Sequence, residues 1–227
     1  MIKARFWGVR GSVPSPLVDK QINQVSSNIE FTGRKMMGVD PAGEGDDLTV
    51  WVVRDNFHAR VVATENVSND KTIALRTHDL MKEFDIEPAD VIIDNFGIGA
   101  NVAKELLLID HLASVTAVNW GEDASDEDVY LNRRAECCFA AREWFTRGGA
   151  VVGDELQRDL TGYMYRNTLS GKRHIIDKPR LRQKLGRSPD RGDAFFLSFY
   201  HGADLLKSGY QGGVVRTVKK DDIYSAI

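Results

Sequence analysis

The stretch Met36-Met37-Gly38-Val39-Asp40-Pro41 decides the fold class of this 227-residue chain. Its apolar run ends on an aspartate, and two further runs rich in strand-forming residues follow at 48–53 and 58–63. A segment rich in glycine and aspartate, residues 43–47, separates the first run from the second, as expected for a turn between paired strands. The three runs therefore predict a three-stranded meander.

Downstream of the meander, helical and strand patterns alternate. A helix can begin at Asn69 or Asp70, and the short apolar run 91–94 is typical of a central parallel strand. A second helix, opened by the glycines of residues 97–99, leads to a further strand at 115–118. Strands that alternate with helices indicate an α/β sheet.

The second half of the chain adds helices and a hairpin. We expect a long helix at about residues 129–147, stopped by two glycines. Two short runs, 163–165 and 174–176, are separated by a serine-glycine pair and are typical of a β-hairpin. Ser188-Pro189 supplies a cap and a first-turn proline for a last helix, which is expected to end near residue 201.

Composition limits the classes of function. With 42% hydrophobic residues the chain can bury one core, and its formal net charge of −3 argues against a binder that relies on global positive charge. This net charge does not exclude a nuclease, because acidic residues that hold cations and basic residues that contact phosphates cancel in the net charge. The sequence has no apolar run of about 18 residues and no signal-peptide core, so we expect a soluble intracellular protein without a membrane anchor.

Three aspartates stand where an apolar residue would be the default. Asp40 and Asp94 each end an apolar strand, and Asp193 lies one turn into a helix whose next four residues are apolar. A carboxylate against a core is costly unless it is paired, and a divalent cation would stabilise all three. Mg²⁺ and Mn²⁺ prefer such oxygen ligands, and two ions about 4 Å apart can support phosphodiester hydrolysis.

Each aspartate also has an ordinary explanation. An aspartate that follows a strand is most often a turn former or a helix cap. The occurrence of three such residues together favours the metal site.

Several blocks, in the same order along the chain, resemble the nuclease domain of bacteriophage large terminases. They are Val9-Arg10-Gly11-Ser12-Val13-Pro14-Ser15, Gly38-Val39-Asp40-Pro41-Ala42 with Gly45-Asp46-Asp47 and Thr49, Ile93-Asp94-x-x-Gly97-x-Gly99, Tyr130-x-Asn132-x-Arg134-x-Glu136, and Asp177-Lys178 with Ser188-Pro189-Asp190-x-x-Asp193-Ala194. The combined match spans the chain to about residue 201.

This resemblance implies an RNase H-like fold, an α/β architecture with a mixed central sheet flanked by helices. Residues 1–33 would form an N-terminal arm similar to the linker between terminase motor and nuclease, and residues 34–227 would form the nuclease domain, with an extra β-hairpin. Asp40 and Asp94 would lie on neighbouring strands, and the closing helix would deliver Asp193.

The resemblance also implies the activity. Asp40, Asp94 and Asp193 are the expected catalytic residues and ligands of a two-metal Mg²⁺ or Mn²⁺ site that cuts double-stranded DNA concatemers during genome packaging and leaves a 5′ phosphate. Asp190 falls on the same helical face as Asp193 and could be an auxiliary ligand or hydrogen-bond to a ligand.

Basic residues precede and overlap the helix of Asp193, and we interpret them as a track for the DNA backbone. They are Lys178, Arg180, Arg182, Lys184, Arg187 and Arg191, with Lys172 and Arg173 at the hairpin turn as an extension. A solvated charged face is the alternative.

The sequence contains no Gly-x-x-x-x-Gly-Lys-Ser/Thr phosphate loop, so we expect the ATPase motor to be absent. The resemblance implies a small terminase subunit and a portal protein as partners in the cytoplasm of a bacterial host. Two alternatives remain: a RuvC-like junction resolvase, and a catalytically silent module that docks on DNA or portal.

Overall fold

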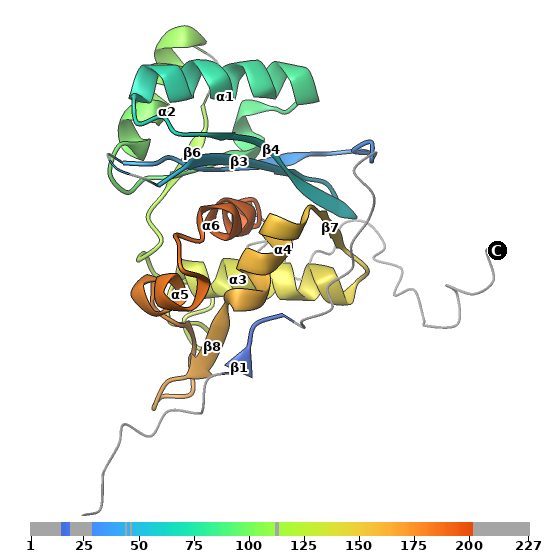
Figure 1. Ribbon diagram of the computed structural model, residues 1–227, viewed down its shortest axis with the longest axis vertical. Coiled ribbons are helices and arrows are strands. Elements are labelled where there is room, and N and C mark those ends of the chain that lie inside the picture. The colour runs from blue at the N-terminus through green and yellow to red at the C-terminus, as the bar shows by residue number, and fades with distance from the viewer. Residues whose placement is uncertain (1–14, 19–28, 44, 46, 112–113, 202–227) are drawn as a thin grey trace, which may run out of the picture.

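A computed structural model describes residues 15–18, 29–43, 45, 47–111 and 114–201. It shows a central six-stranded mixed sheet in the order β6-β5-β2-β3-β4-β7, with helices on both faces (Figure 1). The strands of this sheet are β2 (Met36–Asp40), β3 (Thr49–Arg54), β4 (His58–Glu65), β5 (Val91–Asp94), β6 (Thr116–Val118) and β7 (Ala150–Val152).

The predicted meander is confirmed, since β2, β3 and β4 pair in antiparallel order. Parallel strands extend it on both sides: β5 pairs with β2, β6 pairs with β5, and β7 pairs with β4. The carboxyl ends of β2, β5 and β6 therefore meet at one edge of the sheet.

Two layers of helices enclose the sheet, and the helices are α1 (Asp70–Phe84), α2 (Gly99–Ile109), α3 (Arg133–Thr146), α4 (Asp154–Gly162), α5 (Lys178–Leu185) and α6 (Asp190–Leu197). Helices α1 and α2 cover one face, and α6 lies on the other with α3 and α4 beyond it (Figure 1). A 3-10 turn, η1 (Pro88–Asp90), precedes β5. No helix in the described part of the chain is long and apolar enough to span a bilayer.

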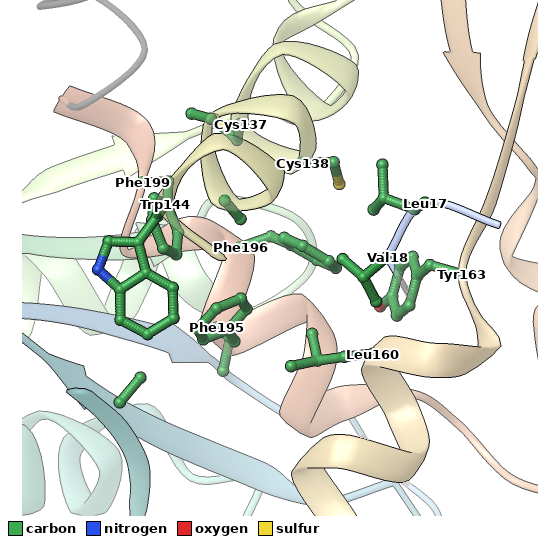
Figure 2. Close-up of a cluster of buried hydrophobic side chains, with 14 of the residues drawn as sticks. Leu17, Val18, Cys137, Cys138, Trp144, Leu160, Tyr163, Phe195, Phe196 and Phe199 are labelled. Atoms are coloured by element: carbon green, nitrogen blue, oxygen red, sulfur yellow. The ribbon is translucent and has the colours of Figure 1, made fainter. Parts of the chain in front are cut away.

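Strand β3 separates two cores because its side chains alternate between the faces of the sheet. Val50 and Val52 belong to the core under α6, whereas Trp51 and Val53 belong to the core under α1 and α2. All six residues of β3 are buried, as expected for a strand covered on both sides. Figure 2 shows the α6 core, in which Phe195 and Phe196 lie between α3 and the sheet.

Gly38 allows α6 to lie directly against the sheet. A Cβ atom at this position would stand 1.9 Å from the Ala194 carbonyl oxygen and 2.9 Å from the Ser198 amide nitrogen. Only a residue without a side chain permits this approach. The glycine in the middle of β2 thus determines how close the second half of α6 lies to the sheet.

A second, smaller sheet contains the predicted hairpin. Strands β8 (Met164–Asn167) and β9 (Arg173–Ile175) pair antiparallel, and β1 (Ser15–Pro16) pairs with β8. Next to β1, Leu17 and Val18 are buried in the α6 core. The rest of the predicted arm, residues 1–14 and 19–28, lies outside the described residues, as does the tail after 201.

Helices α3 and α6 have boundaries that differ from the sequence-based expectation. Helix α3 begins at Arg133 rather than near residue 129, because the Asn132 side chain caps it by accepting a hydrogen bond from the Ala135 amide. Helix α6 begins at Asp190 without a side-chain cap, and the Ser188 hydroxyl instead accepts a hydrogen bond from Arg182. It ends at Leu197 rather than near residue 201. The predicted start of α1 is confirmed, with Asn69 as its cap.

Candidate active site

Asp40 and Asp94 end two neighbouring parallel strands. Val39 of β2 is in register with Ile93 of β5, so the two aspartates that follow these residues lie side by side. Each aspartate is only 8% exposed. The expected placement of these two residues on adjacent strands is thus confirmed.

Helix α6 brings two further aspartates to the same edge. Asp190 and Asp193 occupy its first turn and are both buried. Gly192, between them, lies against Tyr163, where a Cβ atom would stand 2.7 Å from the ring. Asp190 is fixed from the other side, because one of its oxygens accepts a hydrogen bond from the Leu48 amide at 3.1 Å.

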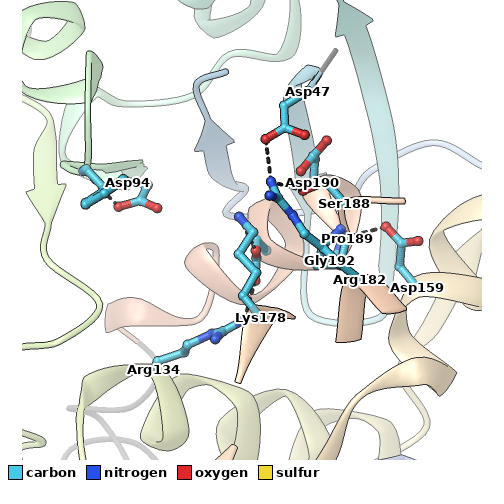
Figure 3. A network of polar contacts seen from close by, with 12 residues as sticks. Asp47, Asp94, Arg134, Asp159, Lys178, Arg182, Ser188, Pro189, Asp190 and Gly192 are labelled. Atoms are coloured by element: carbon cyan, nitrogen blue, oxygen red, sulfur yellow. Dashed lines mark hydrogen bonds and ion pairs between the residues drawn. The ribbon is translucent and has the colours of Figure 1, made fainter. Parts of the chain in front are cut away.

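These four aspartates and Asp47 line one pocket of about 560 Å³, together with Arg134 and Lys178. Figure 3 shows Asp94 on one side of Lys178 and Asp190 on the other. These residues come from β2, β5, α3, α5 and α6, so segments distant in sequence meet at one place.

Asp193 is the most strongly held of the four carboxylates. It accepts hydrogen bonds from the Tyr163 hydroxyl at 2.7 Å and from Arg134 at 2.9 Å, and Lys178 Nζ lies 2.9 Å from it. Burial alone would raise its pKa, but Arg134, Lys178 and the tyrosine hydroxyl lower the pKa of Asp193 to about 2. Asp193 is therefore ionised at neutral pH.

Asp40 and Asp94 have the opposite electrostatic character. Burial raises the pKa of Asp40 well above its ordinary value, and the neighbouring carboxylates raise it further while Lys178 opposes them. Burial also raises the pKa of Asp94, although the Phe96 amide donates a hydrogen bond to its carboxylate. Within the described part of the chain, the Asp40 carboxylate forms no direct hydrogen bond or ion pair. Both groups would be stabilised by an added cation.

The donor set fits a hard divalent cation. Buried carboxylate oxygens are the ligands that Mg²⁺ and Mn²⁺ prefer, and Asp40 has free acceptor capacity. In the described residues, no three acidic, histidine or cysteine side chains are close enough together to hold an ion in their present positions. Positive charge is instead supplied by the Lys178 ammonium, which interacts electrostatically with Asp40, Asp190 and Asp193.

Comparison with known proteins supports the fold. No protein-family model matches the sequence, and no curated protein matches it significantly. Among solved structures, the nuclease domain of the large terminase subunit gp2 of bacterial virus Sf6 matches at 19% identity with a TM-score of 0.64, over 75% of this chain and 90% of that one. The large terminase nuclease of thermophilic phage G20c with bound magnesium matches at 17% identity with a TM-score of 0.54, over 82% and 94%.

The chain has the fold of a phage large-terminase nuclease domain. The large terminase of bacteriophage HK97 matches as well, at 14% identity with a TM-score of 0.56, over 83% of this chain but only 44% of that chain. The predicted RNase H-like architecture is therefore confirmed.

Within this terminase-nuclease fold, the predicted basic residues do not form one continuous track. Lys178 and Arg182 line the pocket, and Arg180 is exposed on the same helix. Arg187 and Arg191 instead turn toward α4, where each lies 2.6 Å from a carboxylate, of Asp159 and Glu155 respectively. Lys184 donates a hydrogen bond to the last residue of α4.

The hairpin residues also differ in their surroundings. Lys172 is half-buried next to the turn of the hairpin. The Arg173 guanidinium lies 4.6 Å from the centre of the Phe139 ring and 5.7 Å from that of Tyr130. Arg173 is thus stacked within the protein.

Two residues of the site were given no role from the sequence alone. Arg134 stands in the block Tyr130-x-Asn132-x-Arg134-x-Glu136, so its membership of that motif was the available signal. Tyr163 carried no signal, because its hydroxyl reaches Asp193 only through the packing of α4 and β8 against α6.

Proposed function

We propose that this protein is a divalent-metal-dependent endonuclease that cuts double-stranded DNA during phage genome packaging. One observation carries the proposal: Asp40, Asp94, Asp190 and Asp193 line a single pocket at the carboxyl edge of the sheet. The fold supports it, since the matching solved structures are nuclease domains of large terminases.

The proposed metal ligands are Asp40, Asp94 and Asp193, with Asp190 as an auxiliary ligand. Solved relatives include the Sf6 domain with manganese and the G20c domain with magnesium, and for this chain we propose a pair of Mg²⁺ or Mn²⁺ ions. Such ions, when bound, supply a water activated for in-line attack and stabilisation of the departing 3′ oxygen.

The chain's own residues prepare the site for a phosphate. Arg134 and Tyr163 keep Asp193 ionised and fix its orientation through their hydrogen bonds to its carboxylate. Lys178 and Arg182 line the pocket and can bind phosphate oxygens, which offsets the repulsion between DNA and the carboxylates. We assign the leading DNA contacts to Lys178, Arg180 and Arg182, with Lys172, Arg173, Lys184, Arg187 and Arg191 as weaker contributors.

Selection of the cutting site would come from partners. The proposed partners are the small terminase subunit, the portal protein and the motor domain, in the cytoplasm of the bacterial host. Backbone contacts alone carry no base information, so we expect low sequence preference from this chain.

Plasmid digestion tests the proposal. Wild-type protein is expected to convert supercoiled plasmid to nicked and linear forms with Mn²⁺ or Mg²⁺ and to lose this activity in EDTA. Asp40→Asn and Asp193→Asn should each reduce cutting by at least about 100-fold, because each removes an anionic ligand.

The matched control is Asp79→Asn, which makes the same charge change at an exposed position of α1. It should cut like wild type. Full activity of both site variants would refute the nuclease assignment, and DNA binding without any cutting would favour a silent docking module. Symmetrical cutting of four-way junctions in preference to duplex would favour a junction resolvase.

A further inference from the structure

Phe96 is an apolar residue in an unusual position. It is 87% exposed, the highest value among the large hydrophobic side chains of the described residues. A ring left in water forgoes the stabilisation that burial gives other phenylalanines of this chain, such as Phe195. The side chain also lines the pocket that contains the four aspartates.

The turn that carries Phe96 is held at several points. The Phe96 amide donates to the Asp94 carboxylate at 3.0 Å, and the Asn95 amide donates to the Val118 carbonyl at 2.7 Å. Gly97 follows with a φ of 65°, a left-handed conformation that favours glycine. The backbone therefore presents the ring outward from a fixed point next to Asp94.

The chemistry of the ring limits what it can bind. The Phe96 side chain has no charge and no hydrogen-bonding group, so it cannot bind the phosphate. The metal ions and the basic side chains of the pocket would bind it. The apolar, flat part of a DNA substrate is the face of a nucleobase, and aromatic stacking on a base tolerates any sequence. Apolar side chains can enter a duplex where a base step is partly unstacked.

From this placement we infer that Phe96 stacks on a nucleobase beside the phosphate to be cut, at a base step opened for it. The inference rests on the proposed nuclease function and adds a base contact to it. Opening a step costs free energy, so the site should bind best where a step is already weakened. Phe96 thereby selects DNA by deformability rather than by sequence.

Binding to two short labelled duplexes, one matched and one with a central mismatch, tests the inference. Anisotropy is measured with the full chain in EDTA at low salt, where no cutting occurs and phosphate contacts are strongest. Wild type should prefer the mismatched duplex several-fold. Phe96→Ala should bind that duplex about 5- to 100-fold more weakly and lose the preference, whereas Phe96→Trp should retain both.

Phe57→Ala is the matched control, because Phe57 is also an exposed phenylalanine, with 56% of its side chain accessible. It lies in the turn that follows β3, whereas Asp40 pairs with Val50 near the start of that strand. It should behave like wild type. Equal binding and equal mismatch preference in wild type and Phe96→Ala would overturn the inference and point to a protein partner for the ring. So would a wild-type protein that does not bind DNA.

Plasmid cutting, measured in parallel with Mn²⁺, separates this inference from the proposed function. If wild type cuts the plasmid and Phe96→Ala binds DNA like wild type, the nuclease function is supported and the inferred base contact is refuted. If wild type does not cut but prefers the mismatched duplex in a Phe96-dependent way, the base contact is supported and the nuclease function is refuted.

Discussion

Lys178 stands among the buried carboxylates of the pocket. Its ammonium lies 2.9 Å from Asp193 and interacts electrostatically with Asp40 and Asp190, and the carboxylates raise the pKa of the lysine in return. The sequence placed Lys178 in a basic segment but did not show that it would enter the acidic pocket. Only the packing of α5 against α4 brings it there.

Replacement of Lys178 by methionine should have opposite effects without and with metal. Methionine keeps most of the apolar stem of Lys178 but leaves the carboxylates without a neighbouring cation. The unfolding free energy of the metal-free protein should therefore fall by about 1 to 2 kcal/mol. This value is kept small because the lysine side chain is partly exposed to solvent. Thermal denaturation should show a larger stabilisation by Mn²⁺ than in wild type. Arg180→Met, on the exposed side of the same helix, is the control, and equal Mn²⁺ shifts in all three proteins would contradict the role of Lys178.

Asp55 shows how a buried carboxylate can serve structure alone. Its oxygens accept hydrogen bonds from the amides of Thr32, Phe57 and His58. Burial by itself raises the pKa of Asp55, but these three amide donors outweigh it and the pKa is lowered. Burial of an aspartate therefore does not identify a metal ligand, and the distinction lies in whether the backbone already satisfies the carboxylate.

The lowered pKa of Asp55 predicts a pH-dependent stability. Because the folded-state pKa lies below the unfolded value of about 3.9, ionised Asp55 stabilises the fold above that pH, and the contribution is lost as the pH falls through the folded-state pKa. Asp55→Asn should cost about 2 kcal/mol at pH 7 and progressively less toward pH 3, measured by urea unfolding. A cost that is the same at both pH values would contradict this assignment.

Among the helices and strands, those with a clear apolar pattern were predictable, whereas those without one were not. Helix α1 and strand β5 carried clear apolar patterns that matched their boundaries. Helix α5 appeared only as a basic stretch, because Leu181 is its single buried residue and no apolar stripe exists. Strand β7 has three residues and α4 buries two leucines, so neither produced a pattern long enough to detect.

The contact between β2 and α6 positions the helix that carries Asp190 and Asp193. Gly38→Ala should destabilise the protein by several kcal/mol, roughly 3 or more, because the new methyl group would meet the Ala194 carbonyl at 1.9 Å in a packed core. Metal affinity should fall with it, since α6 carries Asp193. Calorimetry of unfolding and Mn²⁺ titration measure the two effects.

Gly43→Ala is the matched control for that change. A Cβ atom at residue 43 meets nothing within 4 Å, so this variant should unfold within about 0.5 kcal/mol of wild type. If Gly38→Ala were as stable as Gly43→Ala, the close approach of α6 to β2 would be incorrect.

In the whole molecule, the sheet topology brings together aspartates that are far apart in the sequence. The acids at the ends of β2 and β5 could be predicted from their strand-end positions, and Asp193 from its place before an apolar run. Their convergence followed from a family resemblance rather than from composition or periodicity. It depends on the parallel pairing of β2 with β5 and on the packing of α6 on the face of the sheet with its first turn at that edge. Both are long-range features that no local pattern encodes.

Anomalous diffraction from a crystal soaked in Mn²⁺ would show directly whether the aspartates of the pocket share metal ions. We predict two manganese peaks in the pocket, with the carboxylates of Asp40, Asp94 and Asp193 as ligands and Lys178 displaced from Asp193. A pocket without manganese at saturating concentration, with Lys178 still bound to Asp193, would contradict the account.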